Sequence, residues 1–246
     1  METYDYIVVG AGSAGAVVAA RLSEDPRVRV LLLEAGPAGH PWSHIPIGYA
    51  KLVANPAVNW LYAGEPEPAT GGRRLAVPRG RILGGSSAIN GMAFVRGQAQ
   101  DFDGWAQMGN RGWSYAEVLP FFRKMERYEG GGDDAFRGRD GPLRVTDPTP
   151  RDPLYTTLIA AAAQVGIPHN PDYNGAVQDG IAMSQASIAG RRRMSTARCY
   201  LDPARRRPNL RIATGALAEA LLFEGRRCVG VRYAAGGQAQ EARAGR

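Results

Sequence analysis

The chain has 246 residues, 44% of them hydrophobic, which is enough to form the core of one large or two small domains. No apolar run reaches the roughly 20 residues of a membrane-spanning helix, and no signal peptide is recognisable, so we expect a cytoplasmic protein with no transmembrane segment. The net charge is +7, and nearly all of the basic residues are arginines. Its clusters at 191–193 and 205–207 lack interleaved aromatic residues, so we predict a solvated surface and no nucleic-acid partner.

Cysteine usage excludes two further classes of protein. The chain has two cysteines, Cys199 and Cys228, too few for a disulfide framework. Neither has the spacing to another cysteine or histidine that zinc sites use. We therefore predict no metal site.

The first predicted elements form a β-α-β unit. Tyr6 to Val9 is a short apolar run typical of a buried parallel strand. Ser13 to Glu24 has apolar residues at helical spacing, and Val28 to Leu33 is a second apolar run. This order and length are typical of a nucleotide-binding fold.

The loop between the first strand and the helix reads GAGSAG, and its glycines have separable roles. Gly10 permits the tight turn, Gly12 lets a diphosphate approach the backbone, and Gly15 lets the helix lie close to the strand. The helix N-terminus offers N–H groups and partial positive charge to phosphates. Glu34 follows the second strand, where its carboxylate would accept hydrogen bonds from ribose hydroxyls and repel a 2′-phosphate. The motif alone leaves FAD and NAD both open.

A second glycine-rich segment favours FAD. Residues 78–97 read PRGRILGGSSAINGMAFVRG, in which Gly84 and Gly85 begin another turn of small residues. A second place where backbone can approach a ligand suits a long dinucleotide such as FAD. An NAD-dependent dehydrogenase fits the opening of the chain but not this segment.

The later part of the chain predicts two helices and a small meander. Ser114 begins a helix with a capping box, which Pro120 is expected to break or restart. Asp152 is a predicted N-cap for a helix that ends before Gly166. Strands are expected at 210–213, 218–223 and 228–233, the last two as part of an antiparallel meander.

The second glycine-rich segment resembles the first signature of the glucose–methanol–choline (GMC) oxidoreductases. The similarity extends over essentially the whole chain, most closely to bacterial choline-dehydrogenase-like members. The residues that carry it include Gly80-Arg81, Leu83 to Ser87, Ile89-Asn90, Phe94, Gly97, Asp101 to Trp105, Tyr173 to Gly175, Ser195 to Ala197 and Tyr200-Leu201.

The resemblance implies an α/β fold with a Rossmann-like FAD-binding domain and part of a second, substrate-side α+β domain. The FAD-binding domain would be discontinuous and incomplete. We expect it over residues 1–150 and 201–246, with the partial substrate domain at 151–200.

The resemblance also implies cofactor-binding residues, position by position. The first segment would face the diphosphate, the carboxylate after the second strand would bind the adenosine ribose, the second segment would lie along diphosphate and flavin, and one later backbone position would meet adenine. These residues are Gly10, Gly12, Ser13, Ala14 and Gly15; Glu34 and Ala35; Gly84, Gly85, Ser86, Asn90, Gly91 and Ala93; and Ala218.

The activity that the resemblance implies is oxidation of an alcohol, with hydride passing to flavin and electrons going on to oxygen or a quinone. Some relatives attach flavin through a histidine where this chain has Ile89, so we predict non-covalent FAD. The catalytic histidine of the family, with a second histidine or an asparagine beside it, is expected in a C-terminal half that this sequence lacks. His40, His44 and His169 stand in no matching context, so no catalytic residue is assigned. Two alternatives remain open. One is a truncated, inactive FAD-binding fragment that a complementary C-terminal chain would complete, and the other is a flavin-dependent lyase.

Overall fold

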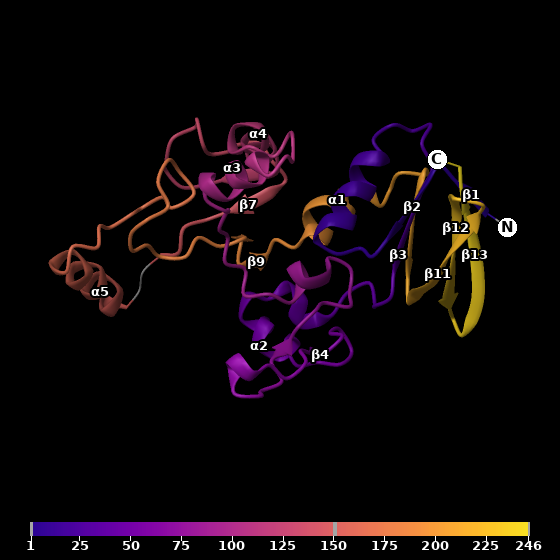
Figure 1. Ribbon diagram of the computed structural model, residues 1–246, viewed down its shortest axis with the longest axis horizontal. Helices are drawn as coiled ribbons and strands as arrows, with labels where there is room; N and C mark the ends of the chain where they lie inside the picture. The colour runs from indigo at the N-terminus through magenta and orange to yellow at the C-terminus, as the bar shows by residue number, and fades with distance from the viewer. Residues whose placement is uncertain (1, 150–151, 246) are drawn as a thin grey trace. The chain divides into compact units, whose positions relative to one another are not determined.

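The computed structural model describes residues 2–149 and 152–245 (Figure 1). Its contacts divide the chain into two compact units. The first unit comprises the residues up to Gly91 together with those from Arg191 onward, and the second unit comprises Met92–Gly190. The functional domain boundaries expected at 150 and 200 stay a prediction.

A three-stranded parallel sheet positions the first glycine-rich loop. It contains β2 (Tyr6–Val9), β3 (Val30–Glu34) and β10 (Leu210–Thr214), in the order β10-β3-β2. Helix α1 (Ser13–Leu22) connects β2 to β3. Every residue of β3 is buried, as expected for a central parallel strand. The predicted β-α-β unit is therefore confirmed.

The ends of these elements differ from the prediction by about two residues. Helix α1 ends at Leu22, where the Ser23 hydroxyl donates to the carbonyl of Ala20. Strand β3 begins at Val30 because Val28 N–H instead donates to the carbonyl of Asp25 and closes a turn. Local hydrogen bonds of this kind are not visible in hydrophobic periodicity.

The first unit also contains a four-stranded sheet (Figure 1). Strands β11 (Ala216–Glu224), β12 (Arg227–Ala235) and β13 (Gln238–Ala244) form an antiparallel meander, and β1 (Glu2–Tyr4) pairs with β13 in parallel. The meander confirms the prediction, although β13 was missed because its residues are small or polar. The two sheets share one core, made by Tyr4, Leu31, Leu33, Ala216, Val231, Tyr233 and Ala242.

Short elements fill the rest of the first unit. Part of this region packs around an apolar cluster of Leu52, Val58, Ile82, Ala88 and Ile89. The short elements are η1 (Pro41–His44), η2 (Pro46–Gly48), α2 (Tyr49–Leu52), β4 (Tyr62–Ala63), η3 (Pro68–Thr70), β5 (Ala76–Val77), η4 (Gly85–Ala88), β9 (Arg192–Arg193), the π-helical turn η5 (Ala197–Leu201) and α6 (Asp202–Ala204).

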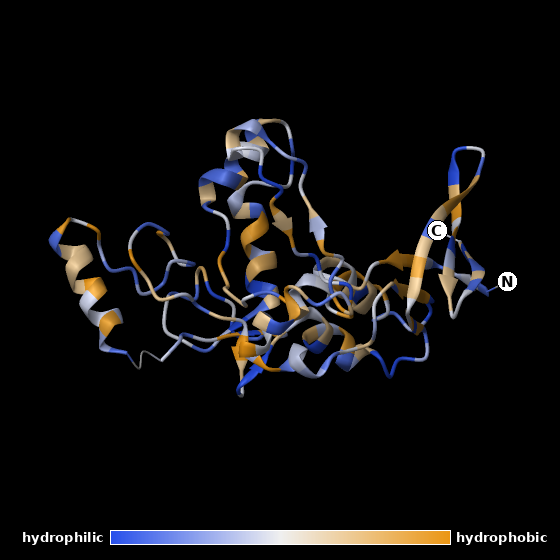
Figure 2. Ribbon diagram, turned by 90° about the horizontal axis from the view of Figure 1, so that it is seen from below, coloured by the Kyte–Doolittle hydropathy of each residue, from blue (hydrophilic) through white to orange (hydrophobic). Residues whose placement is uncertain are grey.

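The described residues of the second unit form three helices and several short strands. These are α3 (Ala99–Gln107), α4 (Tyr115–Met125), β6 (Glu126–Tyr128), β7 (Leu143–Val145), α5 (Pro153–Gln164) and β8 (Ile188–Ala189), with β6 and β7 paired in parallel. Helix α5 begins as predicted, since the Asp152 carboxylate accepts from Leu154 N–H at 2.9 Å. Hydrophobic colour runs along much of α5 (Figure 2), and Leu154 and Leu158 on it are exposed.

The predicted break at Pro120 was wrong, because α4 runs through it. Proline removes one intrahelical N–H and crowds the carbonyl four residues earlier, which here belongs to Ala116. The start of the helix is fixed independently, since the Glu117 carboxylate accepts from both the N–H and the hydroxyl of Ser114. Among the described residues, no helix combines the length and the apolar character that crossing a membrane requires.

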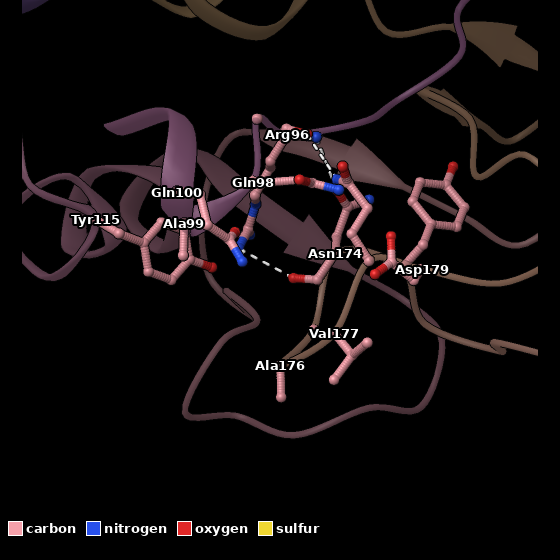
Figure 3. Close-up of a pocket in the computed structure, with 13 residues that line it drawn as sticks. Arg96, Gln98, Ala99, Gln100, Tyr115, Asn174, Ala176, Val177 and Asp179 are labelled. Carbon is pink, nitrogen blue, oxygen red and sulfur yellow. Dashed lines mark hydrogen bonds between the residues drawn. The ribbon is translucent and has the colours of Figure 1, made fainter. Parts of the chain in front are cut away.

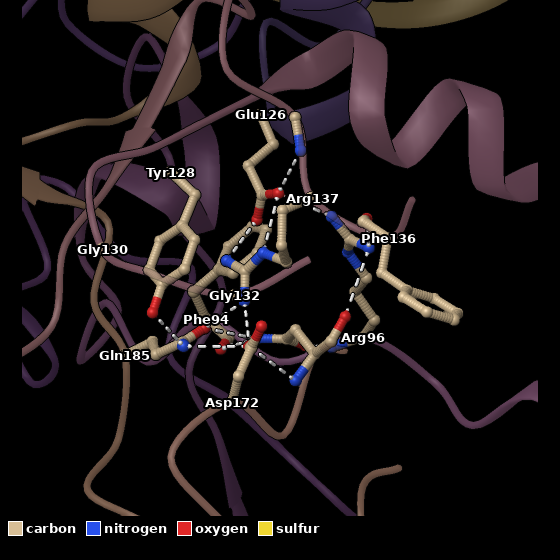
Figure 4. A network of polar contacts seen from close by, with 12 residues as sticks. Phe94, Arg96, Glu126, Tyr128, Gly130, Gly132, Phe136, Arg137, Asp172 and Gln185 are labelled. Atoms are coloured by element: carbon tan, nitrogen blue, oxygen red, sulfur yellow. Dashed lines mark hydrogen bonds and ion pairs between the residues drawn. The ribbon is translucent and has the colours of Figure 1, made fainter. Parts of the chain in front are cut away.

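The centre of the second unit is a buried network of charged and amide side chains (Figure 4). Glu126 accepts from Arg96 Nη2 and from Arg137 Nη2, each at 2.7 Å, and its side chain is fully buried. Arg137 also pairs with Asp172 and donates to Gln185 Oε1 at 3.0 Å. Each buried guanidinium in this network therefore has a carboxylate partner.

Candidate functional site: two glycine segments in contact

The two glycine-rich segments of the first unit lie against each other. We call residues 10–15 the first segment and residues 84–91 the second segment. Gly84 N–H donates to the carbonyl of Ala11 at 2.8 Å. A Cβ added at Gly85 would lie 2.6 Å from Gly12 Cα, and Gly85 has φ +51°. Only glycine fits this approach, so side-chain-free backbone from two distant parts of the sequence forms one surface.

The first segment packs as its glycines predict. Gly10 turns the chain off β2 at φ +87°, and its N–H donates to the carbonyl of Leu33 at 2.8 Å. A Cβ at Gly15 would lie 1.9 Å from the carbonyl oxygen of Gly10, which confirms the close approach of helix and strand. Ser13 and Ala14, in the first turn of α1, are exposed.

The start of α1 leaves backbone donors available. The N-cap is Gly12, and no side chain in the described part of the chain caps it. The N–H groups of the first helical turn have no partner inside a helix, and the helix dipole places partial positive charge there. The arrangement is therefore suited to an anionic group such as a phosphate.

Glu34 lies at the end of β3, beside the first segment. Its Oε2 accepts from Ala11 N–H and its Oε1 accepts from Gly36 N–H, both at 2.9 Å. The residue is 5% exposed, and burial raises the pKa of its carboxyl, against the opposing effect of these two N–H donors. A carboxylate has about four acceptor positions, so the remaining ones could take hydroxyl donors. Ala35, between Glu34 and Gly36, is half-buried.

Hydroxyl side chains hold the second segment in shape. Ser86 Oγ accepts from Gly80 N–H at 3.1 Å. Ser87 Oγ lies 2.6 Å from the carbonyl oxygen of Gly84 and 3.0 Å from Thr196 Oγ1. The segment ends at the exposed residues Asn90 and Gly91. Its interior is thus fixed while its end is open to solvent.

Ile89, the position considered for flavin attachment, and the predicted site residues Ala218 and Ala93 lie in different surroundings. Ile89 is 3% exposed and packs in the apolar cluster of the first unit. Ala218 lies on β11 where the register with β12 shifts between Ala218 and Ala220, and such irregularities interrupt a ladder. Ala93 is exposed and belongs to the second unit. Its place in a cofactor site therefore stays a prediction.

Arg193 is the residue of this site that sequence reasoning missed. Arg191 and Arg192 are exposed, as expected for a solvated cluster, but Arg193 is 1% exposed. Its Nη1 donates to the carbonyl of Asn90 at 2.6 Å and to Asn90 Oδ1 at 2.7 Å. The expectation of a solvated surface was therefore wrong for Arg193. Three successive arginines carry no signal in the sequence that singles out the buried one.

The histidines have local roles. His40 Nδ1 accepts from Trp42 N–H at 3.3 Å at the start of η1, and His44 ends the same element. His169, in the second unit, forms an isolated bridge with Ile181. Across residues 2–149 and 152–245, no three His, Cys, Asp or Glu side chains gather closely enough to hold a metal ion.

The second unit has a cavity of about 180 Å³ next to its buried network (Figure 3). Amide side chains and backbone dominate its wall, including Gln98, Asn174 and Gln178. The Arg96 guanidinium on that wall already donates to Glu126 and to the carbonyl of Phe136. Its charge is thus compensated within the protein, and the cavity is a weaker candidate for an anionic ligand than the two glycine segments.

Comparison with known proteins decides the family. The sequence model of the GMC oxidoreductases matches residues 4–245. The chain belongs to the GMC oxidoreductase family. This confirms the resemblance and, with the parallel sheet described above, the α/β fold class.

Curated GMC relatives are similar over almost the whole chain. The oxygen-dependent choline dehydrogenase of Paraburkholderia phytofirmans is 46% identical over 99% of this chain and 44% of its own length. The mitochondrial choline dehydrogenase of Mus musculus is 43% identical over 98% of this chain and 42% of its own length. The chain thus spans less than half the length of these relatives.

Solved GMC structures have the same fold. Pyridoxine 4-oxidase from Mesorbium loti superposes with a TM-score of 0.92 at 35% identity, over 98% of this chain and 48% of that one. Formate oxidase of Aspergillus oryzae, in a structure concerned with FAD modification, superposes with a TM-score of 0.90 at 26% identity, over 100% of this chain and 44% of that one. The family membership, together with the FAD named for the formate oxidase structure, implies FAD as the cofactor.

Proposed function

We propose that the first unit binds FAD without a covalent bond and is the cofactor-holding part of an oxidoreductase that acts on CH–OH groups. The observation that carries the proposal is the backbone contact between Gly12 and Gly85. It makes one continuous cradle from two segments, and a cradle of that length suits FAD better than a single loop would. The alcohol is proposed to be of the choline type, because the curated relatives are named choline dehydrogenases.

The proposed roles come from the family resemblance, and the contact between the two segments supports them. The backbone donors of the first segment and the start of α1 would bind the diphosphate, and Glu34 with Ala35 would bind the adenosine ribose. The second segment would lie along the diphosphate and the flavin. The backbone of Ala218, next to its register shift, would meet adenine. Within the first unit, the proposed set is Gly10, Gly12, Ser13, Ala14, Gly15, Glu34, Ala35, Gly84, Gly85, Ser86, Asn90, Gly91 and Ala218. Ala93, in the second unit, stays a prediction from the family resemblance.

Non-covalent attachment is supported by Ile89. Its side chain has no nucleophilic atom, and it is packed among Leu52, Val58 and Ile82. A bond from this position to flavin would require both a different side chain and a different packing. We therefore expect acid to release the flavin intact.

The chemistry divides between the cofactor and the protein. When bound, the flavin of FAD supplies a two-electron acceptor for the hydride that leaves the alcohol carbon. The hydroxyl proton must go to a base with a pKa near the working pH, and no side chain of the described residues is assigned that role. We propose that the length present in the relatives but not in this chain supplies it, as a continuation or as a complementary chain. The electron acceptor, oxygen or a quinone, and a cytoplasmic location stay predictions.

A binding titration tests the proposal. The 246-residue chain, shown to be folded by its far-ultraviolet circular dichroism, is titrated with FAD, NAD⁺ and NADP⁺ while flavin fluorescence and the melting temperature are followed. Of the three nucleotides, we expect only FAD to raise the melting temperature. We also expect trichloroacetic acid to release all of the bound flavin. Stabilisation by NAD⁺ without FAD would reject the proposal.

A second measurement separates the related alternatives. Flavin bound to the chain is mixed anaerobically with choline, alone and together with the missing part of a curated relative. Bleaching of the flavin absorbance only in the completed protein supports an oxidoreductase. Bound flavin that an alcohol bleaches in neither case would instead favour an inactive FAD-binding module or a flavin-dependent lyase.

A further inference from the structure

The ion pairing of Arg193 is unlike that of the buried arginines Arg96 and Arg137. Arg96 and Arg137, in the second unit, both pair with Glu126. Arg193 is as deeply buried, at 1% exposure, yet among the described residues no carboxylate forms an ion pair with it. Burial alone lowers the pKa of its guanidinium to about 10, so the group remains a cation at neutral pH.

The hydrogen bonds of Arg193 use one side of its guanidinium. Nη1 donates to the carbonyls of Ser87 and Asn90, at 3.2 Å and 2.6 Å, and to Asn90 Oδ1. Nε and Nη2 are buried without a hydrogen-bond partner. A buried polar group without a partner costs free energy, and a buried charge without a counter-ion costs more. The fold thus retains a cation that its own side chains do not neutralise.

The Arg193 guanidinium contacts the second segment, which is part of the proposed FAD cradle. Its acceptors, Ser87 and Asn90, belong to the second segment. Ser87 is in turn connected to the first segment through Thr196. Ser87 Oγ lies 3.0 Å from Thr196 Oγ1, and Thr196 Oγ1 lies 3.4 Å from the carbonyl oxygen of Gly12. Charge in a buried site acts on neighbouring charges with little screening.

We propose that Arg193 is a positioning residue for FAD, which fixes the Ser87–Asn90 backbone and supplies the uncompensated positive charge that the anionic diphosphate neutralises on binding. The inference rests on the proposed function. It explains why the cation has no carboxylate partner, since an internal acid would cancel the attraction for the ligand. It also predicts opposite effects of charge removal on the free and the FAD-bound protein.

The test compares Arg193→Met with Arg193→Lys in the 246-residue chain. Melting temperatures without FAD and dissociation constants for FAD, from fluorescence quenching, are measured for both. We expect Arg193→Met to leave the FAD-free melting temperature unchanged or higher, because it removes a buried, uncompensated charge. We expect the same variant to weaken FAD binding by about 30-fold or more, the lower end of the cost of truncating one partner of a buried charge pair. Arg193→Lys keeps the charge and should bind FAD within about threefold of wild type, less than the 1.4 kcal/mol of a tenfold change.

Arg192→Met is the matched control, since Arg192 lies on the same strand and is exposed. It removes one positive charge and should leave both measurements unchanged. A lower FAD-free melting temperature in Arg193→Met with an unaltered dissociation constant would mean a purely structural role and overturn the inference. If that variant does not fold, Arg193→Gln replaces it under the same criteria. A wild-type chain that binds no FAD overturns the proposed function as well, whereas FAD binding that is insensitive to Arg193 overturns only this inference.

Discussion

The two units hold irregular backbone in place by different physical means. The first unit brings Gly12 and Gly85 together without side chains between them, and hydroxyl groups such as Ser87 brace the turn. The second unit fills its centre with the charged side chains of Arg96, Glu126 and Arg137. The first arrangement leaves backbone N–H groups and open surface for a ligand, whereas the second pairs its buried charges with one another. This contrast explains why the candidate site lies in the first unit.

Glu126→Gln should give the largest effect, because it breaks the internal charge balance of the second unit. The substitution keeps the shape but leaves two buried guanidinium groups without their shared carboxylate. Breaking a buried ion pair costs about 3–5 kcal/mol of unfolding free energy. Hydrogen exchange read by mass spectrometry should show faster exchange in peptides from 92–190.

The matched control for that variant is Glu65→Gln. Glu65 pairs with Arg74 at 3.2 Å, but both side chains are exposed. Such pairs contribute about 0–1 kcal/mol, so little change is expected. Equal effects of the two substitutions would contradict the idea that buried charge organises the second unit.

Gly85→Ala should give the next largest effect and test the first unit. The added Cβ would lie 2.6 Å from Gly12 Cα, at a residue with φ +51°. We expect a loss of about 1–3 kcal/mol of stability, the usual cost of overpacking, together with the loss of measurable FAD binding. Thermal unfolding and a fluorescence titration check the two effects.

Gly71→Ala separates strain from contact in that experiment. Gly71 also has a positive φ, +66°, but a Cβ there meets no atom within 4 Å. It should cost about 1–2 kcal/mol through backbone strain alone and leave the affinity for FAD unaltered. If Gly71→Ala weakened FAD binding as much as Gly85→Ala, contact between the two segments would not be the cause.

Asp152→Ala should have a moderate effect that is confined to one helix. The Asp152 carboxylate accepts from Leu154 N–H at the start of α5. Loss of an N-cap costs about 0.5–2 kcal/mol. Faster hydrogen exchange is expected at the first turn of α5, with no change at Glu126. Restoration by Asp152→Asn, which keeps an acceptor, would show that capping rather than charge is responsible.

The smallest effect that we expect is a change in the pH dependence of stability in Glu34→Gln. The folded-state pKa of Glu34 is raised above the ordinary value of 4.5, so the folded chain binds more protons than the unfolded chain just above that pH. By linkage, this residue makes stability fall as the pH rises through the interval between the two pKa values. Glutamine removes that contribution. Wild type should therefore lose stability relative to Glu34→Gln as the pH rises above 4.5, measured by urea unfolding at several pH values; an opposite slope would contradict the assigned direction.

Secondary structure was largely predictable because its signals are local. The run from Tyr6 to Val9, the GAGSAG loop and the Asp152 cap each act within a few residues. Element ends were less predictable, since hydrogen bonds such as Val28 N–H to the Asp25 carbonyl decide them. The continuity of α4 through Pro120 was also missed, because the prediction relied on the tendency of proline to interrupt a helix, which the folded chain does not follow here.

By itself, the sequence determined that a β-α-β nucleotide fold is present, with two runs of small residues and an acid at the end of a strand, because glycine spacing and apolar periodicity encode these directly. Only the tertiary structure decided that the two runs touch at Gly12 and Gly85. It alone also distinguished the buried Arg193 from its exposed neighbours. The physical reason is that contacts and burial depend on which distant residues fold against a given position, and three adjacent arginines have identical chemistry until that folding separates them.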